Sequence, residues 1–88
     1  YLKMFGLRIN LDEVEQQIKN QNIDSACLGR DDYLKVLITN PHKKSFITNY
    51  LSQSLGINKS YLSVGIVKKI PKSPDGKILY SNLQNLTT

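Results

Sequence analysis

The 88-residue sequence predicts a single α+β domain: a two-layer sandwich in which two main helices cover a small mixed three-stranded sheet, beside a short N-terminal hairpin. Three observations predict this fold. Strand-like and helix-like hydrophobic patterns alternate along the chain. Hydrophobic residues make up 40% and charged residues 22% of the chain, an ordinary globular balance. The length is enough for one hydrophobic core and for one domain.

The N-terminal elements are a hairpin and a helix. Residues 1–9 predict two short strands that turn at Gly6. Asn10 follows them and can cap a helix over residues 11–20, and Glu13 stands three residues later, as in a capping box. The apolar residues of this helix share one face at helical spacing: Leu11, Val14 and Ile18.

The next segments predict two strands of the sheet. Residues 23–29 and 33–39 have strand-like composition, and the short gap between them favours antiparallel pairing. In the second strand one set of apolar residues (Leu34, Val36 and Ile38) alternates with a second set: Tyr33, Lys35, Leu37 and Thr39.

The C-terminal half predicts a second helix and a third strand. The helix is expected to begin after Pro41 and to end at Gly56. Its expected buried side consists of Phe46, Ile47, Tyr50, Leu51 and Leu55. Residues 61–67 predict the third strand, and residues 81–86 predict a short polar helix.

Composition limits the function classes. The net charge of +5 favours an anionic partner such as a nucleotide, a nucleic acid or an acidic protein. The chain has no apolar run near the ~18–20 residues of a membrane span and no signal-peptide pattern, so we expect no membrane partner. The single cysteine, Cys27, excludes an internal disulfide and fits a cytoplasmic location. The strand-like start at Tyr1 is interpreted as the beginning of a fragment of a longer protein; a processed or trimmed chain is the alternative.

Several kinds of chemical site are not supported by the residues present. No metal site is expected, because His42 and Cys27 are far apart and the Asp31-Asp32 pair is typical of a solvated turn. A phosphate-binding P-loop is excluded because Pro71 occupies its first glycine position. The single histidine offers no nucleophile–histidine grouping.

Nucleic-acid binding remains as an alternative. Six lysines could form a basic face: Lys43, Lys44, Lys68, Lys69, Lys72 and Lys77. No RNA- or DNA-recognition motif accompanies them, so we expect no nucleic-acid partner. A stand-alone basic module for RNA or an acidic protein is therefore the rival interpretation.

Two segments carry the strongest functional signal. Residues 2–15, LKMFGLRINLDEVE, fit the pattern K-x-x-G-x-R-[IV]-x-x-x-E-[IV]-E, and residues 71–78, PKSPDGKI, fit P-[KR]-[ST]-x-x-G-K-[IV]. Together they resemble the C-terminal domain of the acyl- and aminoacyl-adenylate-forming enzymes, which include acyl-CoA synthetases, non-ribosomal peptide synthetase adenylation domains and luciferases. The resemblance covers residues 1–88 as one small, mobile domain.

The resemblance implies an ATP-dependent acid–thiol ligase. A large N-terminal adenylation domain, which lies outside this chain together with the hinge, would bind ATP and a small carboxylic acid. It would also hold most of the Mg²⁺ ion's ligands. The acid would first form an acyl-adenylate. The small domain would then rotate, and coenzyme A or the phosphopantetheine arm of a carrier protein would displace AMP. The small domain alone is expected to be inactive.

The resemblance also implies roles for residues of the two motifs. Lys77 is expected to meet carboxylate and phosphate oxygens during adenylation, with Gly76 permitting the turn and a close backbone approach. The alternative is an exposed hairpin lysine without a catalytic role. Tyr80 stands where many relatives have arginine.

The glycine turn of the first motif is the second expected site. Gly6 and Leu7 are expected to line the pantetheine path, and Arg8 to contact a phosphate of the thiol substrate. The local alternative for Arg8 is an ion pair with either of two nearby carboxylates, Glu13 or Glu15. Lys3 is a weaker candidate for the same electrostatic role. The sequence FGLR replaces the commoner serine-glycine-aromatic form, so the identity of the thiol stays open.

Overall fold

The computed structural model describes residues 2–30 and 32–79, and its elements confirm the α+β prediction. In chain order these are β1 (Leu2–Met4), β2 (Leu7–Ile9), α1 (Leu11–Lys19), β3 (Ser25–Arg30), β4 (Tyr33–Ile38), α2 (Lys44–Leu55) and β5 (Leu62–Ile66). Two short 3-10 turns, Pro41–Lys43 and Lys59–Tyr61, precede α2 and β5. The short helix expected over residues 81–86 lies outside the described residues.

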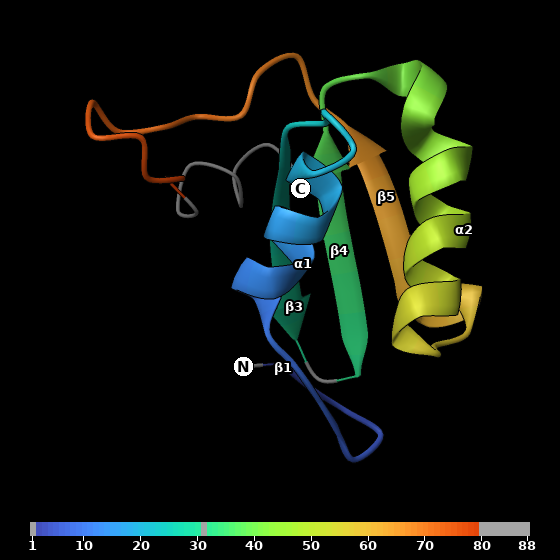
Figure 1. The fold of residues 1–88 in the computed structure, drawn as a ribbon. Helices are drawn as coiled ribbons and strands as arrows, with labels where there is room; N and C mark the ends of the chain where they lie inside the picture. Colours follow the sequence, from blue (N-terminus) through green and yellow to red (C-terminus); the bar gives the residue numbers. More distant parts are fainter. Residues whose placement is uncertain (1, 31, 80–88) are drawn as a thin grey trace.

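The strands form a hairpin and a separate mixed sheet, as expected. Strands β1 and β2 pair with each other, and the main sheet has the order β3-β4-β5. Val36 of β4 lies opposite Cys27 of antiparallel β3 on one side and opposite Val64 of parallel β5 on the other. Both helices lie on one face of this sheet (Figure 1).

Helix α1 begins where its sequence signals place it. The Asn10 side chain accepts hydrogen bonds from the main-chain N–H groups of Asp12 and Glu13, at 3.0 and 3.3 Å. The return bond of a capping box, from Asn10 N to the Glu13 carboxylate, is absent from the bonds between residues 2–30. Val14 and Ile18 bury the apolar face of the helix against the sheet.

Helix α2 ends at Gly56, as expected, but its buried face is narrower than expected. Gly56 has φ = 70°, which favours glycine at a helix C-terminus. Ile47 and Leu51 are fully buried, whereas Phe46 is 45% exposed, so its expected burial is wrong. Phe46 lies beside the buried face of the helix, and its ring stacks on that of Tyr50 with the ring centroids 6.0 Å apart. In the part of the chain that the structure describes, no helix is both long and apolar enough to cross a membrane.

The sheet is covered by helices on one face and partly covered on the other. The helix-covered face carries the larger cluster, which includes Leu34, Val36, Ile38, Ile47 and Leu51. A smaller cluster on the opposite face consists of Ala26, Leu37 and Ile70, with Leu28, Val67 and Ile78 packed against it. The simple alternation expected in β4 is therefore incomplete, since Leu37 belongs to the opposite set and is only 2% exposed. The segment after β5 covers this second face and carries the second sequence motif with it.

Candidate functional site

Residues 71–79, which we call the lysine loop, form a tight hairpin. Lys72 and Ile78 pair as an antiparallel bridge. The Gly76 N–H donates a hydrogen bond to the Ser73 carbonyl at 2.9 Å, and Gly76 has φ = 90°. This is the geometry of a three-residue hairpin loop whose last residue is a glycine bulge.

The local sequence explains this turn. Proline at position 74 sets φ for the first loop residue, and Asp75 suits the second. A Cβ atom added at Gly76 would meet nothing within 4 Å, so the left-handed backbone, rather than crowding within this domain, requires the glycine. The close approach expected at Gly76 would have to involve another molecule or domain.

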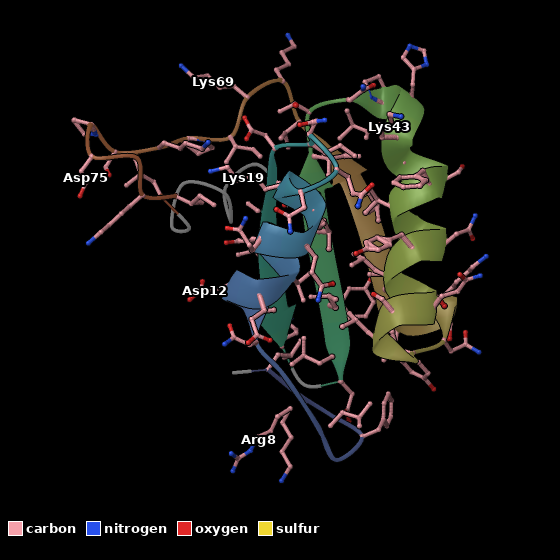
Figure 2. The ribbon with its side chains drawn as sticks, in the orientation of Figure 1. Arg8, Asp12, Lys19, Lys43, Lys69 and Asp75 are labelled. Atoms are coloured by element: carbon pink, nitrogen blue, oxygen red, sulfur yellow. The ribbon has the colours of Figure 1, made fainter. Side chains whose placement is uncertain are left out.

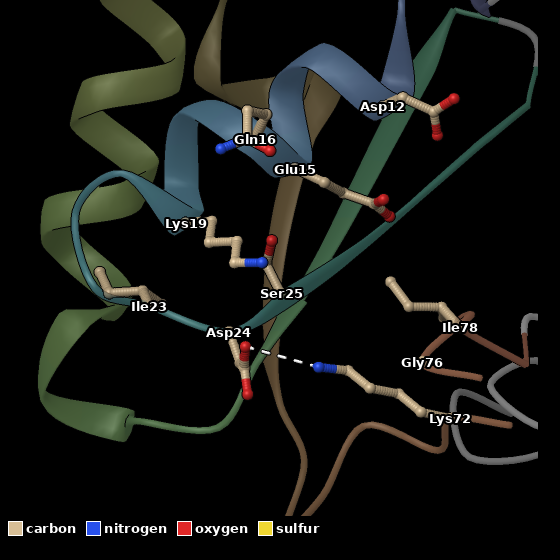
Figure 3. Close-up of a pocket in the computed structure, with 10 residues that line it drawn as sticks. All are labelled: Asp12, Glu15, Gln16, Lys19, Ile23, Asp24, Ser25, Lys72, Gly76 and Ile78. Carbon is tan, nitrogen blue, oxygen red and sulfur yellow. Dashed lines mark ion pairs between the residues drawn. The ribbon is translucent and has the colours of Figure 1, made fainter. Parts of the chain in front are cut away.

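Lys77 is the first residue after the turn and is exposed. Its ammonium group makes no ion pair with any acidic side chain in residues 2–30 and 32–79. Lys72, on the other strand of the hairpin, does pair: its Nζ lies 3.6 Å from Oδ1 of Asp24 (Figure 3). Because both of these side chains are well exposed, this pair contributes little to stability.

The lysine loop is attached to the domain through Ile78 and through Ile70, the residue that immediately precedes the loop. Ile70 is 4% exposed and packs on Ala26 and Leu37, and Ile78 packs against the same cluster. Between the loop and α1 lies a polar cavity of about 200 Å³, bordered by Gly76 and Ile78 (Figure 3). The loop thus has a buried apolar base and an exposed turn.

The expected site residues of the first motif lie on the β1–β2 hairpin. Its two-residue loop is Phe5-Gly6, and both residues have positive φ, at 50° and 84°, as tight hairpins of this kind require. A Cβ atom at Gly6 would meet nothing within 4 Å, so here too the turn itself requires glycine. Leu7 is 48% exposed immediately after the turn.

Arg8 and Lys3 are cross-strand neighbours on this hairpin. Both are exposed, and Figure 2 shows the Arg8 guanidinium directed away from the body of the domain. Arg8 makes no ion pair with Glu13, one of the two carboxylates considered for it, within residues 2–30. A cavity of about 180 Å³ beside Arg8 extends towards α1 and the end of α2, and it is bordered by Gln17, whose Oε1 is buried without a hydrogen-bond partner in the described part of the chain.

Three contacts between described residues help to hold the hairpin on the domain, and sequence reasoning found none of them. The Phe5 N–H donates a hydrogen bond to Asp32 Oδ1 at 2.8 Å, and the Phe5 ring packs edge-on against Tyr61 with centroids 4.7 Å apart. Leu2 lies directly over Gly29 of β3. Asp32 is an exposed turn residue, as expected, and it also anchors the hairpin. Its only sequence signal is an aspartate in the β3–β4 turn, where it adopts φ = 53°.

The two motifs are not brought together in one site. The hairpin projects from one end of the domain, and the lysine loop lies towards the other (Figure 1). Each presents an exposed turn with one basic side chain next to a glycine-containing bend. The two turns are therefore separate features of the surface, at different places on the fold.

The buried cysteine and the acidic residues offer no separate chemical centre. Burial raises the pKa of the Cys27 thiol well above its ordinary value, and the nearby Glu15 and Asp12 carboxylates raise it further. A thiol held protonated in this way is a poor nucleophile. The Glu15 carboxylate instead accepts a hydrogen bond from the Cys27 main-chain N–H at 2.7 Å. Within residues 2–30 and 32–79, no three potential metal ligands gather.

Comparison with known proteins identifies the fold. No protein-family model matches the sequence, and no curated protein matches it. Among solved structures, the chain is similar to an acyl-CoA synthetase from Brucella canis, with a TM-score of 0.69 and 20% sequence identity over 97% of this chain. The chain corresponds to only 18% of the length of that protein. It therefore has the fold of a small part of an acyl-CoA synthetase.

Proposed function

We propose that this chain is the small C-terminal domain of an ATP-dependent acid–thiol ligase of the acyl-CoA synthetase type. The observation that carries the proposal is a coincidence of three features. The fold is that of a segment of an acyl-CoA synthetase, the two sequence motifs fall on exposed turns, and each turn presents a basic residue, Lys77 or Arg8. Fold alone would not imply function, but fold and site chemistry agree here.

In the first half-reaction, Lys77 assists adenylation. A carboxylate oxygen of the acid attacks the α-phosphorus of ATP, an acyl-phosphate bond forms, and pyrophosphate leaves. Two anionic groups must approach each other for this step. The Lys77 ammonium, on its long side chain, enters the large domain's cleft and offsets this charge without exchanging a proton. ATP and Mg²⁺ are bound mainly by the large domain.

In the second half-reaction, the domain rotates and offers the β1–β2 hairpin. The thiol sulfur loses its proton to solvent and attacks the acyl carbonyl carbon; a thioester forms, the bond from that carbon to the phosphate oxygen breaks, and AMP leaves. Gly6 and Leu7 border the path of the pantetheine arm, and Arg8, supported by Lys3 across the hairpin, binds a phosphate of the thiol substrate. Coenzyme A is the favoured thiol, and a phosphopantetheine-bearing carrier protein is the alternative.

The test is acid-dependent ATP–pyrophosphate exchange by the longer protein that this proposal implies, across a panel of small carboxylic acids. Exchange is expected with one class of acid. Lys77→Ala should reduce that exchange by about 10²–10³-fold, the usual effect of removing a positioned charge from a transition state. Thioester formation from preformed acyl-adenylate should change little.

The matched control is Lys69→Ala, which removes the same charge from the same segment, at an exposed position outside the hairpin (Figure 2). It should leave exchange unchanged. If the parent shows no exchange with any acid, the ligase proposal is wrong, and salt-dependent RNA binding becomes the next experiment. If exchange survives Lys77→Ala, the ligase stands and Lys77 is a surface residue.

A further inference from the structure

Ser73 contacts Lys77 through both its main chain and its side chain. The Ser73 N–H donates to the Lys77 carbonyl at 2.7 Å, and the Lys77 N–H donates to the Ser73 Oγ at 3.2 Å. The same hydroxyl donates its own hydrogen to Asp75 Oδ1. We call this arrangement of Ser73, Asp75 and the Lys77 main chain the hydroxyl clasp.

The side-chain part of the clasp is not needed to close the hairpin. Main-chain bonds already close it: Ser73 N to the Lys77 carbonyl, Gly76 N to the Ser73 carbonyl, and Leu79 N to the Pro71 carbonyl. Any non-proline residue at position 73 could make its share of these bonds. What the serine hydroxyl adds is a partner for the Lys77 N–H, oriented by the Asp75 carboxylate.

This addition matters because no hydrogen bond or ion pair from residues 2–30 and 32–79 holds the ammonium end of the Lys77 side chain. Its ammonium makes no ion pair with the described acidic residues, so within this domain its direction is set from the main-chain end. A long flexible side chain magnifies any change in the backbone from which it departs. Small displacements of a catalytic group can cost about 10²-fold in rate.

We propose that Ser73 is a positioning residue, which orients the Lys77 backbone through the hydroxyl clasp so that the ammonium reaches the reacting oxygens during adenylation. The inference rests on the proposed function. Ser73 touches neither substrate nor ATP; it acts through Lys77. Its hydroxyl, rather than its size, is the feature that matters.

The test compares Ser73→Ala and Ser73→Thr in the longer protein, with kcat and KM for ATP–pyrophosphate exchange as the readout. Ser73→Ala is expected to lower kcat by roughly 10- to 100-fold with KM for ATP nearly unchanged. Ser73→Thr keeps the hydroxyl and should restore most of the rate. Ser45→Ala, at an exposed serine of α2 without a side-chain hydrogen bond among the described residues, is the control and should match the parent.

A double mutant separates positioning from a general structural effect. If Ser73 acts through Lys77, then adding Ser73→Ala to Lys77→Ala should cause no further loss of exchange. Full activity of Ser73→Ala would overturn the inference, as would equal losses in the alanine and threonine variants or a further loss in the double mutant. A parent without exchange would overturn the proposed function as well. Exchange that is lost in Lys77→Ala but kept in Ser73→Ala would overturn only the role of Ser73.

Discussion

At the scale of single residues, the side chains of Lys77 and Arg8 make no ion pair with the described residues, whereas the turns before them have a constrained backbone. Lys77 follows a glycine at φ = 90°, and Arg8 lies two residues after a glycine at φ = 84°. In both turns the glycine satisfies a backbone requirement that other residues meet at a cost of about 1–2 kcal/mol. Such a turn can expose a long cationic side chain while the main chain that carries the side chain stays fixed.

The titration of Asp75 tests the hydroxyl clasp directly in the 88-residue chain. The hydrogen bond from Ser73 is the main cause that lowers the pKa of Asp75 below its ordinary value; desolvation opposes it, and the main-chain N–H groups of Lys77 and Asp75 lower the pKa further. We therefore expect Ser73→Ala to raise the pKa of Asp75 towards its ordinary value. The measurement is a pH titration of the Asp75 carboxyl carbon by NMR in both proteins.

The direction of the pH effect follows from the lowered pKa. A carboxyl group with a lowered folded-state pKa stabilises the fold above its unfolded-state pKa, and this contribution is lost as pH falls through the folded-state value. The clasp should therefore be intact at neutral pH and loosen only below about pH 4. Because Asp75 is fully exposed, the effect belongs to the loop and not to global stability. Superimposable titration curves for the two proteins would show that the clasp is absent in solution.

The residue patterns of the two motifs could be recognised from the sequence, but their supporting contacts could not. Gly6 and Gly76 were both expected at turns, and both have positive φ. The anchor from Phe5 N to Asp32 joins residues 27 positions apart, and no local pattern reports such a contact. The burial of the second face of β4 could be predicted only in part. The alternation placed Leu37 opposite the main core set, but the residues that cover Leu37 depend on the path of the chain after β5.

At the scale of elements, the β1–β2 hairpin depends on a close contact with β3. An added Cβ atom at Gly29 would lie 2.5 Å from Leu2 Cδ2 and 2.8 Å from Leu2 Cδ1. The backbone of Gly29 does not have positive φ, so the requirement for glycine comes from the neighbouring side chain. The absence of a side chain at Gly29 of β3 therefore leaves room for Leu2 of the hairpin.

Gly29→Ala is expected to displace the hairpin and to destabilise the chain by about 1–3 kcal/mol, the usual cost of overpacking. Leu2→Ala removes the clashing atoms, so the double mutant should be more stable than the sum of the two single effects predicts. Urea unfolding of the four proteins measures this coupling. Additive effects would mean that Leu2 moves aside freely and that the contact does not position the hairpin.

At the scale of the whole molecule, the sheet separates two clusters of different size. The larger one joins both helices to the sheet, whereas the smaller one attaches only the segment that carries the lysine loop. Small clusters with few buried contacts open at lower free energy than the main core. The lysine loop should therefore be able to detach locally while the helices and sheet remain folded.

Two isoleucine substitutions distinguish local opening from global unfolding. Ile47→Ala truncates a fully buried side chain of the helix-covered core and should lower the free energy of unfolding by about 2–5 kcal/mol, with faster amide exchange everywhere. Ile70→Ala should lower it less, because its cluster is small and lies at the margin of the domain. Its main effect should be faster hydrogen exchange at the amides that close the lysine loop, those of Gly76 and Leu79.

Hydrogen exchange of the 88-residue chain, read residue by residue, measures both effects in one experiment. The Val14 amide, which donates a hydrogen bond to the Asn10 carbonyl at the start of α1, reports on the main core. In Ile70→Ala we expect Gly76 and Leu79 to lose protection while Val14 keeps it. Equal loss at all three amides would mean that the two faces unfold together. The position of Lys77 would then depend on the stability of the whole domain and not on the smaller cluster beneath it.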